Sequence, residues 1–81
     1  MNLQDIAEAT AEHYGTTVEA MCGYSRLPED VRPRQVYCFL ADKWTGESKS
    51  QIGRIIRRDH TTVTSSLARV AHYDISAEVA A

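Results

Sequence analysis

Apolar residues recur at intervals of three and four along the 81-residue chain, and no stretch shows the apolar–polar alternation of a strand. Short breaks that contain glycine, proline or helix-capping residues separate these helical stretches. The pattern predicts an all-α fold. Because a chain of this length can enclose only one core, we expect a single compact domain of about five helices over residues 1–81, with a core over 3–72 and a tail over 73–81.

The first two helices are indicated by a buried face and by a capping pattern. The first helix has one face made of Leu3, Ile6, Thr10 and Tyr14. Gly15 is placed to end that helix. Thr16 and Glu19 have the spacing of a capping box, which predicts a short second helix that runs through Met21.

A loop and a longer helix follow. Gly23 and Pro28 discourage a continuous helix, so a loop is expected over 23–31. Pro33 suits the first turn of a third helix, where its missing N–H has no partner to lose. That helix carries an apolar stripe made of Val36, Phe39, Leu40 and Trp44. Gly46 is expected to end it, and Tyr37 and Trp44 are expected in the core or at its edge.

Two further helices are predicted after a second capping box. Ser48 and Gln51 form this box and open a short helix that buries Ile52, Ile55 and Ile56. Asp59 then caps the last helix, since its carboxylate can accept the N–H groups of the following turn. The buried face of the last helix consists of Val63, Leu67 and Val70. Its opposite face carries Thr61, Ser65, Ala68 and His72, with Thr64 at the edge.

This last pair of helices has the pattern of a helix-turn-helix, in which the second helix enters the DNA major groove. An aspartate can accept from the cytosine amino group, and a threonine methyl can pack on the thymine methyl. Arg57 and Arg58 lie just before the helix, whose N-terminal end also attracts phosphate. The small polar face lets another surface come close. The pattern therefore indicates binding of double-stranded DNA.

The charge distribution is uneven. The net charge is −2, but residues 26–58 hold eight arginine and lysine residues against four acidic ones. Residues 1–24 hold four acidic residues and neither lysine nor arginine. A local basic region matters more for phosphate binding than the total charge. From charge alone, a phosphate-binding surface and an ordinary solvated helix surface are equally good interpretations.

Several classes of protein are not indicated by the sequence. No apolar run has the length of a membrane span, and the N-terminal segment lacks the pattern of a signal peptide, so we expect a cytoplasmic protein. Cys22 and Cys38 belong to no CxxC pattern and are expected to be small buried residues without a metal. No Ser/His/Asp or Cys/His arrangement has a motif context. We therefore expect no enzymatic activity and no cofactor.

The central part of the chain resembles a known family. The likeness is carried by the segment RPRQVYCFLADKWTGESKSQIGRIIRRDHTTV, with SR at 25–26, RPRQ at 32–35, IGR at 52–54 and RDHTTV at 58–63. This segment resembles the C-terminal, DNA-box-binding domain of the bacterial replication initiator DnaA, and the resemblance covers about residues 3–72. It implies a helix-turn-helix fold of the Trp-repressor type.

The resemblance implies base-reading residues. Asp59, His60 and Thr61 match residues that read bases in the major groove, and Arg26 matches an arginine that enters the adjacent minor groove. The family site is an asymmetric box, commonly written TTATCCACA. An asymmetric site implies one monomer per box.

The resemblance also implies contacts to the DNA backbone. Together with Arg57 and Arg58 of the turn, the expected backbone contacts are Arg34, Thr45, Ser48 and Thr62. Further candidates for facing DNA are Lys49, Thr64 and Ser65. Three departures from the family pattern stand out. The turn before Asp59 is one residue shorter than the family's Phe-Gly-Gly-Arg, the loop at 27–30 is acidic, and no GxxxxGK[ST] motif of an ATPase is present.

These observations predict a small regulator of transcription or replication that binds DnaA-box-like DNA and supplies no ATPase. The alternative is a protein-interaction module that keeps the fold and binds a host replication or transcription protein. The acidic first helix motivates this alternative.

Overall fold

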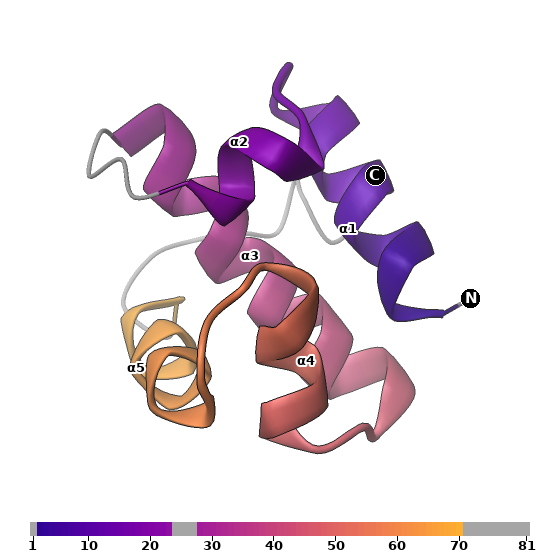
Figure 1. The fold of residues 1–81 in the computed structure, drawn as a ribbon, viewed down its shortest axis with the longest axis vertical. Coiled ribbons are helices and arrows are strands. Elements are labelled where there is room, and N and C mark those ends of the chain that lie inside the picture. The colour runs from indigo at the N-terminus through magenta and orange to yellow at the C-terminus, as the bar shows by residue number, and fades with distance from the viewer. Residues whose placement is uncertain (1, 24–27, 71–81) are drawn as a thin grey trace.

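A computed structural model describes residues 2–23 and 28–70. In these residues it has no strand and five helices, which are α1 (Leu3–His13), α2 (Val18–Cys22), α3 (Pro28–Thr45), α4 (Lys49–Ile55) and α5 (His60–Val70) (Figure 1). The expected all-α fold of about five helices is confirmed. Arg26, His72 and the expected tail over 73–81 lie outside the described residues. None of the described helices combines the length and the apolar character that a bilayer span requires.

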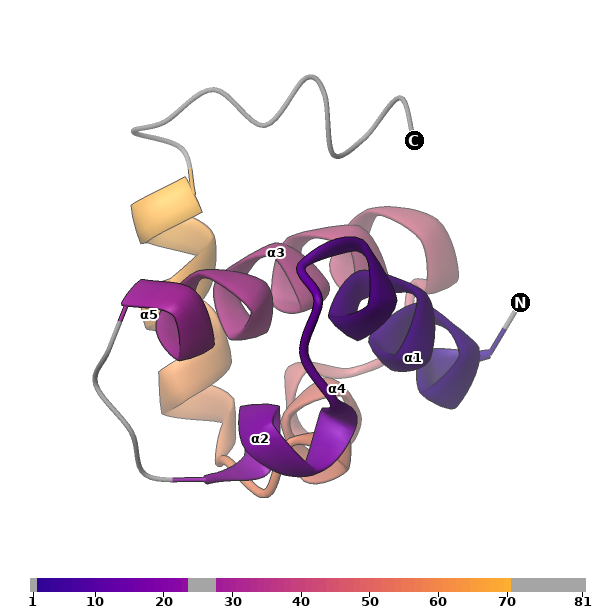
Figure 2. The same ribbon diagram turned by 90° about the horizontal axis from the view of Figure 1, so that it is seen from above.

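Helix α3 is the centre of the fold and contacts each of the other four helices. Helices α1 and α5 lie on opposite sides of it in both views (Figures 1 and 2). Every helix contributes to one continuous core, which consists of Ile6, Ala7, Ala11, Met21, Val36, Tyr37, Cys38, Leu40, Ala41, Ile52, Ile56, Val63 and Val70. The domain measures 26 by 25 by 25 Å along its principal axes.

The helix ends follow local sequence signals at α1, whereas the start of α2 is a correction. Gly15 has a φ of +69° and ends α1, as expected. The second helix is capped by Thr17, whose hydroxyl accepts from the amide of Ala20 at 3.1 Å, and not by Thr16. The amide of Thr16 instead donates to the carbonyl of Ala11 at 2.8 Å. Thr16 therefore belongs to the C-terminal end of α1 and leaves the next residue to cap α2.

Helix α3 begins inside the loop that the sequence pattern predicted over 23–31. Pro28 is its first residue, and Pro33 lies inside the helix. Part of the expected loop at 23–31 is therefore helical. Pro28 meets the steric requirement of a first helical position, whereas the sequence pattern had placed Pro33 in the first turn of this helix. Pro33 removes one helical donor, but its side chain is fully buried, so packing offsets that loss.

The side chains of α3 also correct one expectation about the core. Tyr37 is fully buried, and its hydroxyl donates to the carbonyl of Ile52 at 2.8 Å. Trp44 is 49% exposed although it continues the apolar stripe. It lies in the last turn of α3, where the surrounding surface is formed by the first turn of α1 and by Ile55 at the end of α4. This turn reaches past the core, which leaves half of the indole in solvent.

Candidate nucleic-acid interface

The turn between α4 and α5 is held by a close backbone approach. The amides of Arg57 and Arg58 donate to the carbonyls of Arg54 at 3.2 Å and Gly53 at 2.9 Å. This is the hydrogen-bond pattern of a Schellman motif, in which Arg57 takes the left-handed position with a φ of 56°. A Cβ atom on Gly53 would lie 2.5 Å from the carbonyl oxygen of Arg58. Glycine is therefore required for α4 to pack this closely against the turn.

Asp59 caps α5, as the sequence predicted. Its Oδ1 accepts from the amide of Thr62 at 3.0 Å. The hydrogen bond from this amide is the main reason that the pKa of Asp59 lies below its ordinary value. A carboxylate offers about four acceptor positions, so an oxygen that caps the helix leaves others for a base or a water. The cap fixes the first turn of α5, from which His60 and Thr61 project as exposed side chains.

The outer face of α5 is small and polar, as expected. Thr61, Thr64, Ser65 and Ala68 are exposed, and the hydroxyl of Thr64 donates to the carbonyl of His60 at 3.0 Å. On the inner face, Val63 and Val70 are buried, and Leu67 is partly buried and packs against the core. This face also buries Ser66.

A groove with a volume of about 270 Å³ lies between α3 and α5. It is lined by Val31, Arg34, Gln35, Arg58, Thr61, Thr62, Ser65, Ser66 and Arg69. Five of the residues that the sequence assigned to DNA thus meet in one place, namely Arg34, Arg58, Thr61, Thr62 and Ser65. Arg69 also lines the groove and was not among the residues assigned to DNA from the sequence. Its spacing of seven from Thr62 places both on one stripe of α5, and that spacing was the available signal.

Arg34 and Arg58 use guanidinium hydrogens inside the protein. Arg34 is 9% exposed, and its Nη1 donates to the carbonyl of Gly23 at 2.6 Å and to that of Met21 at 3.3 Å. Arg58 is half-buried, and its Nη1 donates to the carbonyl of Cys22 at 3.1 Å. Each guanidinium has five N–H donors, so these bonds are compatible with an additional contact to phosphate. The phosphate contacts of both arginines stay predictions.

Three other predicted contacts lie away from this groove. Thr45 donates from its hydroxyl to the carbonyl of Ala41 at 2.6 Å. Ser48 caps α4, because its hydroxyl accepts from the amide of Gln51 at 3.2 Å. Lys49 is the exposed first residue of α4. These residues stand at the opposite end of α4 from the turn into α5, about 10 Å away along the helix axis. Their assignment to DNA is not tested by the geometry.

The cysteines differ in burial. Cys38 is fully buried, and burial raises the pKa of its thiol to about 12. Cys22 is half-buried and donates from Sγ to the carbonyl of Ile55 at 3.3 Å. Within residues 2–23 and 28–70, no group of three His, Cys, Asp or Glu side chains is arranged to hold a metal. Small cysteine side chains in such surroundings serve packing and hydrogen bonding.

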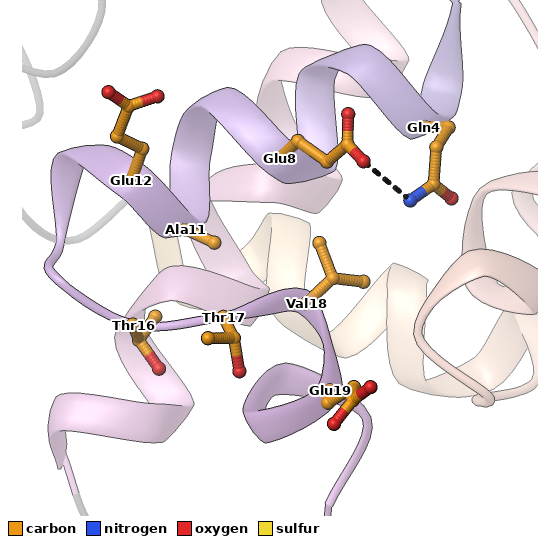
Figure 3. Close-up of a pocket in the computed structure, with 8 residues that line it drawn as sticks. All are labelled: Gln4, Glu8, Ala11, Glu12, Thr16, Thr17, Val18 and Glu19. Atoms are coloured by element: carbon orange, nitrogen blue, oxygen red, sulfur yellow. Dashed lines mark hydrogen bonds between the residues drawn. The ribbon is translucent and has the colours of Figure 1, made fainter.

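A second groove, of about 620 Å³, lies between α1 and α2 and has an acidic rim (Figure 3). Ala11 and Val18 face the space between the two segments, whereas the carboxylates of Glu12 and Glu19 point away from it (Figure 3). Glu8 accepts from Nε2 of Gln4 at 3.4 Å. Helix α1, which carries Glu8 and Glu12, lies on the far side of α3 from α5 (Figures 1 and 2).

Comparisons with known proteins agree with this geometry. Residues 3–70 match the family model described as the bacterial dnaA protein helix-turn-helix. The chain is 41% identical over 66 residues to chromosomal replication initiator protein DnaA 1 of Chlamydia trachomatis. It is 36% identical over 76 residues to the DnaA of Roseobacter denitrificans, and 34% identical over 70 residues to that of Deinococcus radiodurans.

These alignments cover 82%, 93% and 86% of this chain but only 14%, 17% and 15% of the respective relatives. The chain therefore spans less than a fifth of the length of the relatives it matches. No solved structure matches it. The matched family is a helix-turn-helix without a catalytic module, and membership in it implies DNA binding. The match over residues 3–70, more than half of the chain, shows that this protein belongs to the bacterial DnaA helix-turn-helix family.

Proposed function

We propose that the protein binds double-stranded DNA in a sequence-specific way and recognises DnaA-box-like sites through α5. The observation that carries this proposal is the exposed N-terminal end of α5 beside a groove lined with arginines and hydroxyl groups. Such an end can enter a major groove, where the outermost side chains meet base edges. The neighbouring cations and hydroxyls suit the flanking phosphates.

The proposed base readers are the first exposed residues of the recognition helix. His60 can donate or accept at a base edge, and the methyl of Thr61 can pack on a thymine. Asp59 can accept from a cytosine amino group through lone pairs that the helix cap leaves open. Arg26, which lies outside the described residues, is proposed as the minor-groove reader on the basis of the family resemblance alone.

The proposed backbone contacts fall into two groups. One group is near α5 and consists of Arg34, Arg57, Arg58 and Thr62, with Ser65 and Thr64 as further candidates. The other is at the start of α4 and consists of Thr45, Ser48 and Lys49. In a helix-turn-helix the first helix crosses the DNA backbone, so a contact at the start of α4 is geometrically reasonable. The acidic residues of α1 lie away from α5, so they repel the DNA phosphates near α5 less than acidic residues beside that helix would.

The biological role that we propose is that of a small cytoplasmic regulator of transcription or replication, with one monomer on each asymmetric box. A protein that occupies such sites can block or recruit other factors. Host replication or transcription proteins are therefore proposed partners at the DNA. Occupancy of a box depends on affinity relative to other sequences, so sequence preference is the property to measure first.

The test is a fluorescence anisotropy titration with two labelled duplexes, one with TTATCCACA and one with the same bases scrambled. Salt is held near physiological, because electrostatic affinity depends steeply on it. We expect a preference of at least tenfold for the box, about 1.4 kcal/mol. Thr61→Ala is expected to remove about 1–3 kcal/mol of binding to the box with little effect on the scrambled duplex.

The matched control is Gln4→Ala, an exposed substitution on α1 at the far side of α3. It is expected to leave both affinities unchanged. Equal binding of the two duplexes by the unaltered protein would contradict recognition of this box. An unchanged preference in Thr61→Ala would contradict the assignment of α5 as the reader.

A protein-interaction role is the second candidate, and the acidic groove between α1 and α2 is the observation that favours it. It predicts a complex with a host replication or transcription protein that survives both Thr61→Ala and Arg26→Ala. The double substitution Glu8→Gln and Glu12→Gln is expected to weaken that complex in a pull-down. Loss of the complex with Thr61→Ala would count against an interface separate from the DNA-binding surface.

A further inference from the structure

Two arginines from different parts of the chain converge on the C-terminal end of α2. Arg34, in α3, donates from Nη1 to the carbonyl oxygens of Gly23 at 2.6 Å and Met21 at 3.3 Å. Arg58, in the turn before α5, donates from Nη1 to the carbonyl of Cys22 at 3.1 Å and from Nη2 to that of Gly23. The carbonyl of Gly23 therefore receives both guanidinium groups.

The end of α2 depends on these donors. A five-residue helix is too short to be stable by itself, and its last carbonyls have no partners within the helix. Within the described residues, a backbone bond at its C-cap runs from the amide of Gly23 to the carbonyl of Ala20. The two arginines supply further donors to this end of the helix, in the planar arrangement that suits several oxygens at once. They thereby join α2 to α3 and to the turn that leads into α5.

Arg58 also holds the turn itself. Its Nη1 donates to the carbonyls of Ile56 and Arg57, each at 3.3 Å. The same guanidinium thus bonds both to the end of α2 and to the backbone of the turn. The next residue, Asp59, caps α5. The position of the first turn of α5 is consequently tied to α2 through a single side chain.

We propose that Arg34 and Arg58 are positioning residues for base recognition. They fix the N-terminal end of α5 relative to α2 and α3, and thereby set how well the protein discriminates between DNA sequences. This inference rests on the proposed function, and it replaces the phosphate contact proposed above for Arg34 and Arg58 with a role inside the protein.

The two roles have different consequences. Loss of a phosphate contact weakens binding to all duplexes alike and lowers the slope of log affinity against log salt by about one. Loss of positioning lowers the preference for the box and leaves that slope unchanged. Lysine separates the two roles, because it keeps the positive charge but lacks the planar fork that reaches two carbonyls.

The experiment titrates the unaltered chain, Arg58→Lys and Arg58→Ala into the box and scrambled duplexes at three salt concentrations. Arg54→Lys and Arg54→Ala are the matched controls, since Arg54 is an exposed arginine in the last turn of α4 and is not among the residues that line the groove. We expect both Arg58 variants to lose box preference by about tenfold with an unchanged salt slope. Both Arg54 variants are expected to keep the preference. A reduced slope in Arg58→Ala that Arg58→Lys restores would overturn the inference.

A double-mutant cycle tests the connection between the arginine and the reading helix. If Arg58 acts by placing Thr61, the fold-loss of box preference in the double variant Arg58→Lys, Thr61→Ala is smaller than the product of the fold-losses of the two single variants. Independent, multiplicative losses would overturn the inference. Circular dichroism and thermal unfolding confirm that each variant is folded at the assay temperature. Arg34→Lys is the second variant, and unfolding of both lysine variants would show that the pair maintains the whole fold and would also overturn the inference.

The titration also separates this inference from the proposed function. If the unaltered protein binds both duplexes equally, the proposed function fails, and the inference fails with it. If the unaltered protein prefers the box and Arg58→Lys retains that preference, only the inference fails.

Discussion

Arg57 stands in a backbone conformation that suits glycine, and replacing it should stabilise the protein. Its φ is 56°, and it occupies the left-handed position that follows α4. In this conformation the Cβ of an L-residue crowds the following carbonyl oxygen, which costs about 1–2 kcal/mol. Glycine has no Cβ and avoids that cost. We therefore predict that Arg57→Gly raises the free energy of unfolding.

The magnitude follows from two opposing effects. Relief of the left-handed strain contributes about 1–2 kcal/mol. The greater freedom of glycine in the unfolded chain offsets about 0.5–1 kcal/mol of this. The Arg57 side chain is exposed, so its removal leaves no cavity. The expected net gain is about 0.5–1 kcal/mol, which corresponds to a rise in Tm of about 2–8 °C for a domain of this size.

The assay is urea and thermal unfolding followed by circular dichroism. Arg57→Ala removes the same charge but keeps the Cβ, so it should be no more stable than the unaltered protein. Gly15→Ala is the reverse control, because Gly15 has a φ of +69° and open space around its missing Cβ. It should lose about 1 kcal/mol. If Arg57→Gly proved no more stable than Arg57→Ala, the strain argument would be refuted.

Three further predictions concern the turn, the core and the cap. Gly53→Ala should lower the free energy of unfolding in urea by about 1–3 kcal/mol and reduce box preference in the anisotropy titration, because its Cβ would meet a turn carbonyl at 2.5 Å. An unchanged preference would show that the turn adjusts. Tyr37→Phe should lower the free energy of unfolding by about 1–3 kcal/mol, since the buried carbonyl of Ile52 loses the hydroxyl that donates to it. An unaltered urea midpoint would contradict this. The hydrogen bond from the Thr62 amide lowers the pKa of Asp59 in the folded protein. The stabilising contribution of the ionised Asp59 side chain is therefore present above the ordinary aspartate pKa and is lost as the pH falls through the lower folded value. Unfolding measured from pH 6 down to pH 2 should therefore show a loss below about pH 4 that Asp59→Asn reduces, whereas identical pH profiles would rule out this origin.

Much of the fold was predictable because its signals are local. The Ser48–Gln51 box, the left-handed glycine at the end of α1 and the aspartate that caps α5 each act within a few residues. The outward face of α5 was likewise predictable, since helical spacing alone decides which side chains share a face. The position of the first turn of α5, which carries the proposed base-reading residues, can therefore be predicted from the sequence.

The start of α3 was less predictable because two prolines competed for the same role. Pro28 and Pro33 both suit a first helical position, and neither carries a local signal that ranks them. Burial of Pro33 is a tertiary effect, as is the exposure of Trp44 in the last turn of α3. Helical periodicity identifies an apolar stripe but not whether another helix covers its end.

The sequence by itself determined the helical class, most helix ends, the small polar face of α5 and the resemblance to a DNA-binding family. Only the tertiary structure decided what the arginines contact. Arg34 and Arg58 meet carbonyls that are 11 to 36 residues away in the chain, and the groove that they line forms only when α3 and α5 pack together. The physical reason is the sequence distance over which these interactions act. Helix caps and helical spacing involve residues within one or two turns, whereas a charged side chain bonds to any carbonyl that the fold brings within about 3 Å of it.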